Sequence, residues 1–370
     1  MSLVDASKSH NRAERVGILL VNLGTPSAPT AKAVRPYLRE FLSDSRVVEI
    51  PKVIWWFILN GIILPFRSKA SAKKYQSIWL SGPDGGSPLY VHTRAQAELL
   101  GESLNQNEFS GLTVEMAMRY GQPSIEWAMK RLEQQGVDRL LVLPLYPQYS
   151  ATTTASTFDE IFRVMKTWRN QPALRLIKHY HDHPAYIQAL KQHVEQYWAI
   201  HGRPDFENGE RMMMSFHGVP KRTLDLGDPY HCECYKTGRL LREALGLTAE
   251  QAITSFQSRF GKAEWLKPYT SAMLESLGKA SVKRLDVFCP GFPADCLETL
   301  EEIGIEGSEI FKHAGGGEYH AIPCLNENPI WIKALSEIAL ENLHGWNLQL
   351  KTPDELMQRQ EYVTAVQAGK

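Results

Sequence analysis

The feature that most constrains the fold is a regular alternation of short apolar runs with amphipathic segments. Residues 16–23 form an apolar run, which is typical of a strand buried on both faces of a sheet. Thr25 and Pro26 end this run, and residues 31–42 follow with apolar side chains at helical spacing. Because strands that alternate with helices form βαβ units, the pattern predicts parallel sheets.

The alternation occurs in two successive series. Strands are expected at residues 16–23, 113–120, 140–145, 174–179, 212–216, 252–256, 285–288 and 319–323. Helices are expected at residues 31–42, 124–135, 158–168, 184–201, 236–245, 270–277, 296–303 and 328–343. The sequence therefore predicts an α/β fold of two Rossmann-like lobes, each a parallel sheet flanked by helices, with the active-site cleft between them.

The length of 370 residues fits two domains. We expect the lobes to join near residues 183–186. The expected divisions are a disordered leader at 1–14, an N-terminal lobe at 15–185, a C-terminal lobe at 186–325, a closing helix at 326–345 and a peripheral tail at 346–370.

The composition excludes several classes of protein. Lys plus Arg and Asp plus Glu both total 41, and this zero net charge argues against a nucleic-acid-binding protein. Five cysteines are too few, and odd in number, for a secreted disulfide framework. No apolar signal-peptide region and no run of 18 apolar residues is visible. We therefore expect a cytoplasmic protein.

One segment, residues 54–66, differs from the rest of the chain because it contains no charged residue. It contains Trp55, Trp56 and Leu59, and basic residues flank it within residues 52–74. Its apolar side chains recur at helical spacing, but 13 residues are too few to span a bilayer. It is either a buried core helix, or an apolar lip that lies on a membrane surface or closes over a flat apolar ligand.

His217 is the strongest single candidate for chemistry. It follows the apolar run 212–216, and ligands of open α/β sheets bind beyond the carboxyl ends of strands. Gly218 then allows a sharp turn. An imidazole in this position suits proton transfer or binding of a divalent metal, whereas a hydrogen-bonded structural histidine is the alternative.

A second candidate is an acidic series just after another strand end. Asp295, Glu298, Glu302 and Glu306 are three, four and four residues apart, so a helix would place them on one face. Such a row is either a solvated helix face or a path for protons or a hydrated cation. The same end of the sheet should carry His217 and Glu298.

Two further clusters lack the spacing of known sites. His179, His181 and His183 alternate, and His231, Cys232 and Cys234 lie close together, but neither group contains the two spaced ligand pairs of a structural zinc site. The role of His231, Cys232 and Cys234 stays open. The chain also lacks a phosphate-binding loop, a dinucleotide fingerprint and a hydrolase nucleophile elbow.

At these positions the chain resembles the ferrochelatases, enzymes that insert Fe(II) into a porphyrin in the last step of haem synthesis. The motifs are LLVNLGTP at 19–26, GGSPL at 85–89, MRYGQP at 118–123, LPLYPQYSATTT at 143–154, SFHG at 215–218, FQSRFGKAEWLKP at 256–268 and CPGFPADCLETLEE at 289–302. The resemblance runs from about residue 16 to residue 343. It implies two Rossmann-like lobes with the porphyrin between them.

The resemblance also implies roles for individual residues. His217 and Glu298 match the catalytic, metal-binding pair on opposite sides of the pocket, and Glu302 and Glu306 match an acidic path leading from it. The implied porphyrin-binding residues are Leu23, Arg119, Tyr120, Tyr146, Ser258 and Trp265. The implied membrane or pocket lip includes Trp55, Trp56 and Leu59.

Departures from family patterns refine these expectations. Ala151 stands where animal enzymes carry a cluster cysteine, and no cysteine follows Cys324, so we expect no [2Fe–2S] cluster. Cys296 replaces a histidine often seen two residues before the glutamate. Leu23 occupies a position where relatives that use coproporphyrin carry tyrosine, which favours protoporphyrin IX.

The expected reaction partners are protoporphyrin IX and Fe(II), with iron as a substrate and no permanently bound cofactor. We expect a monomer that contacts no nucleic acid, with the lip as a point of peripheral contact with the inner membrane. The alternatives are a chelatase for coproporphyrin or for another metal, and a non-catalytic haem or porphyrin carrier.

Overall fold

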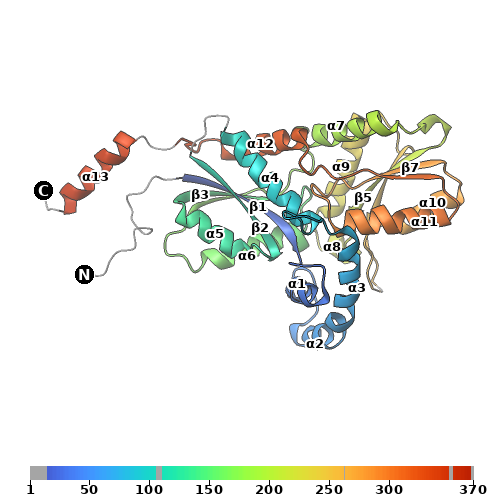
Figure 1. The fold of residues 1–370 in the computed structure, drawn as a ribbon, viewed down its shortest axis with the longest axis horizontal. Coiled ribbons are helices and arrows are strands. Elements are labelled where there is room, and N and C mark those ends of the chain that lie inside the picture. The colour runs from blue at the N-terminus through green and yellow to red at the C-terminus, as the bar shows by residue number, and fades with distance from the viewer. Residues whose placement is uncertain (1–14, 106–110, 262, 350–352, 368–370) are drawn as a thin grey trace.

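The computed structural model describes residues 15–105, 111–261, 263–349 and 353–367, and two parallel four-stranded sheets form its centre (Figure 1). The first sheet has the order β2 (Leu112–Gly121), β1 (Arg15–Thr25), β3 (Val137–Pro144), β4 (Ala173–Leu176). The second has the order β6 (Ala252–Gln257), β5 (Arg211–His217), β7 (Arg284–Phe288), β8 (Glu318–Ala321). The predicted α/β class with two parallel sheets is confirmed.

Helices cover these sheets and connect the strands. In chain order they are α1 (Ala31–Ser43), α2 (Lys52–Ile58), α3 (Leu64–Ile78), α4 (Pro88–Asn105), α5 (Ile125–Gln134), α6 (Ser156–Met165), α7 (Pro184–His201), α8 (Lys221–Asp225), α9 (Tyr230–Ala244), α10 (Thr270–Lys279), α11 (Ser308–His313), α12 (Pro329–Leu343) and α13 (Pro353–Gln367). The π-helices are η2 (Leu59–Ile63), η3 (Ala151–Ala155) and η5 (Glu298–Gly307), and a short 3₁₀-helix is η4 (Phe206–Asn208).

The structure differs from the sequence prediction at several of these elements. Helix α4, 18 residues long, was not predicted. Helix α9 begins at Tyr230 instead of residue 236, so that Cys232 and Cys234 lie on it. The segment expected as an ordinary helix at 296–303 is the π-helix η5, whose wider hydrogen-bonded turns often mark functional sites.

The central strands are where the sequence pattern is clearest. In β1, Val16 to Val21 are all buried, because helices cover both faces of the sheet. The largest apolar cluster includes side chains of both sheets, such as Ile18 and Phe216, together with Trp331 of α12. Helix α12 packs on α7 and α4, so the two sheets share one continuous core.

A helical arm made of α1, α2, η2 and α3 projects from this body (Figure 1). We call residues 52–74 of this arm the lip. Leu59 and Leu64 are buried, but the lip also exposes large apolar side chains, namely those of Val53, Ile54, Trp56, Phe57, Ile62 and Phe66. The interpretation of this segment as a buried core helix is therefore wrong.

The two ends of the chain were expected to be a leader and a peripheral tail. Residues 1–14, expected as a leader, lie outside the described residues. In the expected tail, Leu348 accepts a backbone hydrogen bond from Gly111, and α13 lies apart from the sheets (Figure 1). None of the described helices is long and apolar enough to cross a membrane.

Candidate active site

His217 is the last residue of β5, a strand that lies between β6 and β7 in the second sheet. It therefore lies at the carboxyl edge of this sheet. Its carbonyl oxygen accepts a hydrogen bond of 2.9 Å from the hydroxyl of Tyr230, and its ring meets Phe292 edge-on at 6.4 Å between centroids. At Gly218, a Cβ atom would lie 2.5 Å from the carbonyl oxygen of Gln257 and 3.2 Å from the ring of Trp265. Glycine therefore lets β6 and Trp265 close in beside His217.

The protonation of His217 is set by two opposing influences. Burial lowers its pKa below the ordinary 6.5, and the negative charge of Glu298 partly opposes this shift. The imidazole is therefore neutral at pH 7 and faces a carboxylate, which suits a proton acceptor or a metal ligand. The structure thus brings together the two residues that the sequence placed at one end of the sheet.

Glu298 begins η5, at the junction between the second sheet and the lip. Burial raises the pKa of Tyr37 and Tyr75, and the charge of Glu298 raises both further. Burial lowers the pKa of Arg67, while Glu298 opposes that change. The carboxylate therefore lies among side chains of α1 and α3 as well as beside His217, so the lip forms part of this site.

Gln257 connects the histidine to the acidic helix, and sequence reasoning missed it. It pairs with His217 across strands β5 and β6. Its amide nitrogen donates to the carbonyl oxygen of Glu298 at 2.9 Å and to the Glu302 carboxylate at 3.4 Å. Its amide oxygen accepts from Ser215 at 2.8 Å. Its place inside the FQSRFG motif was the only sequence signal.

The acidic series divides into parts with different surroundings. Glu302 accepts two hydrogen bonds of 2.6 Å from Ser258, which holds a left-handed backbone with φ 64°. Burial raises the pKa of Glu302, although the Ser258 bonds oppose the shift. Glu302 and Glu306 line a cavity of about 150 Å³ together with Ser258. The expectation of one continuous row fails at Asp295, which is buried and bound to Thr299 and Asn326.

The lip is tied to η5 by charge. The Lys74 ammonium lies 2.8 Å from a Glu301 oxygen and 3.1 Å from a Glu306 oxygen. The Arg67 guanidinium stacks on the Phe260 ring at 4.5 Å. Trp55 donates from its indole nitrogen to the carbonyl oxygen of Leu42, which fixes the near end of the lip to α1. The lip is therefore fixed to α1 near its beginning and to η5 near its end.

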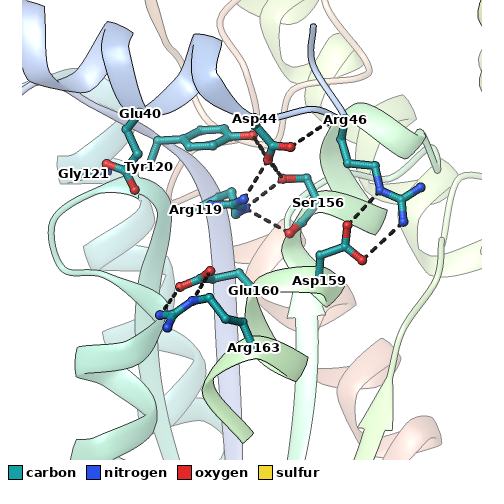
Figure 2. A network of polar contacts seen from close by, with 10 residues as sticks. All are labelled: Glu40, Asp44, Arg46, Arg119, Tyr120, Gly121, Ser156, Asp159, Glu160 and Arg163. Carbon is teal, nitrogen blue, oxygen red and sulfur yellow. Dashed lines mark hydrogen bonds and ion pairs between the residues drawn. The ribbon is translucent and has the colours of Figure 1, made fainter. Parts of the chain in front are cut away.

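Arg119 and Tyr120 lie in a polar network with Asp44 and Ser156 (Figure 2). Arg119 donates to Asp44 at 2.6 Å and to Ser156, and the Tyr120 hydroxyl donates to the same Asp44 oxygen at 2.8 Å. Burial alone would raise the pKa of Asp44, but its hydrogen bonds and the Arg119 charge hold it below its usual value. Arg119 thus already has a carboxylate partner here, and Tyr120 is fully buried.

The other predicted porphyrin-binding residues lie near these groups. Leu23 packs between the apolar cluster of the lip and that around Cys296. Gly24 follows with φ 114°, and a Cβ atom there would lie 1.8 Å from the carbonyl oxygen of Tyr120. The Trp265 indole nitrogen is buried and has no hydrogen-bond partner in the described part of the chain, and Tyr146 is half-buried.

We predict that Asp44→Asn lowers the free energy of unfolding by about 3 kcal/mol, because it leaves the buried Arg119 charge without its partner. Asp159→Asn, which breaks an exposed pair with Arg46, should cost less than about 1 kcal/mol in the same urea titration. The Asp44 effect should shrink as pH falls below about 4, because a carboxyl group with a lowered pKa loses its stabilising charge there. Equal losses in the two variants would contradict this account.

Comparison with known proteins agrees with this geometry. The ferrochelatase family model matches residues 15–343. A curated ferrochelatase of Chromobacterium violaceum is 57% identical over 93% of this chain and 92% of its own length. Among solved structures, SirB from Bacillus subtilis with Fe³⁺ has a TM-score of 0.53 at 14% identity, over 89% of this chain and 96% of that one, a likeness of fold alone. The chain belongs to the ferrochelatase family.

Proposed function

We propose that this protein inserts Fe(II) into protoporphyrin IX, forming protohaem and releasing two protons as the last step of haem biosynthesis. The observation that carries the proposal is the neutral imidazole of His217 beside the carboxylate of Glu298, under an apolar lip. Family membership supports the same reaction. Fe(II) enters as a substrate.

Three tasks face such a site. The porphyrin ring must bend so that its nitrogen lone pairs become accessible, two pyrrole protons must leave, and hydrated Fe(II) must shed water. Leu23 and Phe292 pack against one apolar cluster, and Phe292 also contacts the His217 ring, so apolar surface suited to a flat macrocycle lies beside the histidine. Binding energy from the outer parts of the disc can then support its distortion.

Proton removal follows from the pKa directions. His217 is neutral at pH 7 and can accept a pyrrole proton, and the imidazolium so formed is stabilised by Glu298. Glu302, whose pKa burial raises, can then hold a proton on its way toward Glu306 at the surface. Gln257 keeps Glu298 and Glu302 in register for this path.

The choice of porphyrin, the choice of metal and the alternative of a non-catalytic carrier rest on fewer observations. Leu23 presents an aliphatic side chain to the site, which favours protoporphyrin IX over coproporphyrin. A chelatase for Co(II) or Zn(II) would use the same donors, because the preferences of first-row metals overlap. A non-catalytic carrier would need neither a neutral imidazole nor an acidic path, so we place it last.

Turnover tests the proposal directly. Wild-type protein should consume protoporphyrin IX with Fe(II), seen as the loss of free-porphyrin absorbance bands, and coproporphyrin should react more slowly. His217→Ala should lower kcat at least about 100-fold while porphyrin fluorescence still reports binding. The exposed His313→Ala is the matched control and should keep full turnover. A wild-type protein that binds but never metallates porphyrin would show a carrier.

The electrostatic link between His217 and Glu298 gives a second test, read by NMR titration of imidazole carbons without substrate. In wild type, His217 should titrate below 6.5, because burial disfavours the charged form. Glu298→Gln removes the charge that raises this pKa, so the titration should move to still lower pH. A shift to higher pH, or none, would mean that the two groups do not interact.

We further propose that the lip places the protein on the surface of the inner membrane. Trp56, Phe57 and Phe66 are 60%, 65% and 75% exposed. A groove of about 340 Å³ between α1 and α3 is lined by four cations, Lys32, Arg35, Arg39 and Lys69. Apolar side chains beside basic groups suit the boundary of an anionic bilayer.

Vesicle sedimentation tests this contact. The protein should bind vesicles of phosphatidylcholine and phosphatidylglycerol more strongly than vesicles of phosphatidylcholine alone. Trp56→Ser with Phe57→Ser should lower the partition coefficient at least about tenfold, since two large apolar side chains no longer enter the bilayer. Ile200→Ser, at an exposed apolar residue on α7, is the control and should leave binding unchanged. Equal loss in both variants would refute a specific role of the lip.

A further inference from the structure

Two residue clusters that the sequence analysis kept apart meet in the structure. His179 and His181 follow β4 in the segment that leads to α7, and Glu233 lies in the first turn of α9. One imidazole nitrogen of each histidine and one carboxylate oxygen of Glu233 lie within 4.8 Å of one another. His183 does not join them, because it caps α7 and contacts Glu341.

The contacts inside this group leave one donor atom unused. His179 Nδ1 lies 2.7 Å from Glu233 Oε1, in hydrogen-bonding geometry. His181 Nδ1 lies 3.4 Å from Glu233 Oε2 but forms no hydrogen bond, although its side chain is only 6% exposed. A buried polar atom without a partner carries a free-energy cost, which a bound ligand can remove.

Surrounding residues hold the donors in place. The backbone N–H of Tyr149 donates to Glu233 Oε2 at 2.7 Å. The Thr237 hydroxyl donates to the carbonyl oxygen of His181 at 2.8 Å, and Gln148 donates to Thr237 at 2.9 Å. Such outer contacts orient the ligands of metal sites. The nearby cation Lys236 is already paired with Asp182.

The donor set has a recognisable preference. Two imidazoles and one carboxylate bind Zn²⁺ with bond lengths of about 2.0–2.2 Å, and they also suit Fe(II). In a tetrahedral site two such donors lie about 3.4 Å apart. The donors, now within 4.8 Å of one another, must therefore approach by up to about 1.4 Å through side-chain rotation. Burial also lowers the pKa of His181, which favours the neutral, ligating form. His179 is 39% exposed and leaves a route for the ion.

We propose that His179, His181 and Glu233 form a binding site for a divalent first-row cation, separate from the His217 and Glu298 pair. The proposal does not rest on the iron-insertion reaction. A cation here would clamp the segment after the first sheet to α9. Since Tyr230 of α9 donates to the carbonyl oxygen of His217, the clamp would also steady the strand end that carries the histidine.

Zinc titration tests the site in a background that lacks the pocket ligands. All proteins carry His217→Ala and Glu298→Gln, and calorimetry with Zn²⁺ alone measures binding. This background should bind one equivalent through the triad. Adding His179→Gln, or adding Glu233→Gln, should weaken this binding at least about tenfold. Adding His313→Gln, at an exposed histidine on α11, should change nothing.

Thermal unfolding supplies an independent readout. Zn²⁺ should raise the midpoint of the background protein, because an ion that binds only the folded state stabilises it. The rise should vanish in the His179→Gln protein, whose substituted side chain is exposed enough to leave folding intact, as circular dichroism would verify. The proposal stands only if both triad variants lose binding relative to His313→Gln. Absent binding in the background, or equal binding in all variants, overturns it.

Discussion

A buried imidazole that faces one carboxylate, His217 against Glu298, is the interaction on which the arrangement of the site depends. Burial favours the neutral ring and the carboxylate favours the charged one, so the balance is sensitive to how well the surrounding chain excludes water. Gly218 admits Trp265 on one side, and the lip covers Glu298 on the other.

The parts of the fold that burial alone determines could be predicted from the sequence. Strand β1 is apolar because helices cover both faces of its sheet, and that pattern is local. Helix α4 could not be predicted in this way, because its buried face includes Thr93 and Gln96. The Thr93 hydroxyl accepts from the Asn22 amide of β1, and the Gln96 amide nitrogen donates to the carbonyl oxygen of Pro293, partners that no local pattern reveals.

The residues of the site could be predicted where they follow the carboxyl ends of strands, because ligands of α/β sheets bind there. His217 and Glu298 followed from that rule and from the family motifs, whereas Asp44, the partner of Arg119, lies 75 residues away along the chain. The π-helical form of η5 was hidden because its apolar residues also fit an ordinary helix. Glu233 meets His179 and His181 only through tertiary packing. A search of the sequence for closely spaced pairs of metal ligands therefore does not group the three residues.

The double ion pair of Lys74 with Glu301 and Glu306 affects how the porphyrin and small ions would enter and leave the site. Any outward swing of the lip must separate Lys74 from both carboxylates at once, which leaves two negative charges uncovered at the outer end of η5. When the lip opens to let the macrocycle pass, the two uncovered carboxylates at the outer end of η5 would therefore attract cations and protons. Admission of the macrocycle and exchange of small ions would then be coupled through Lys74.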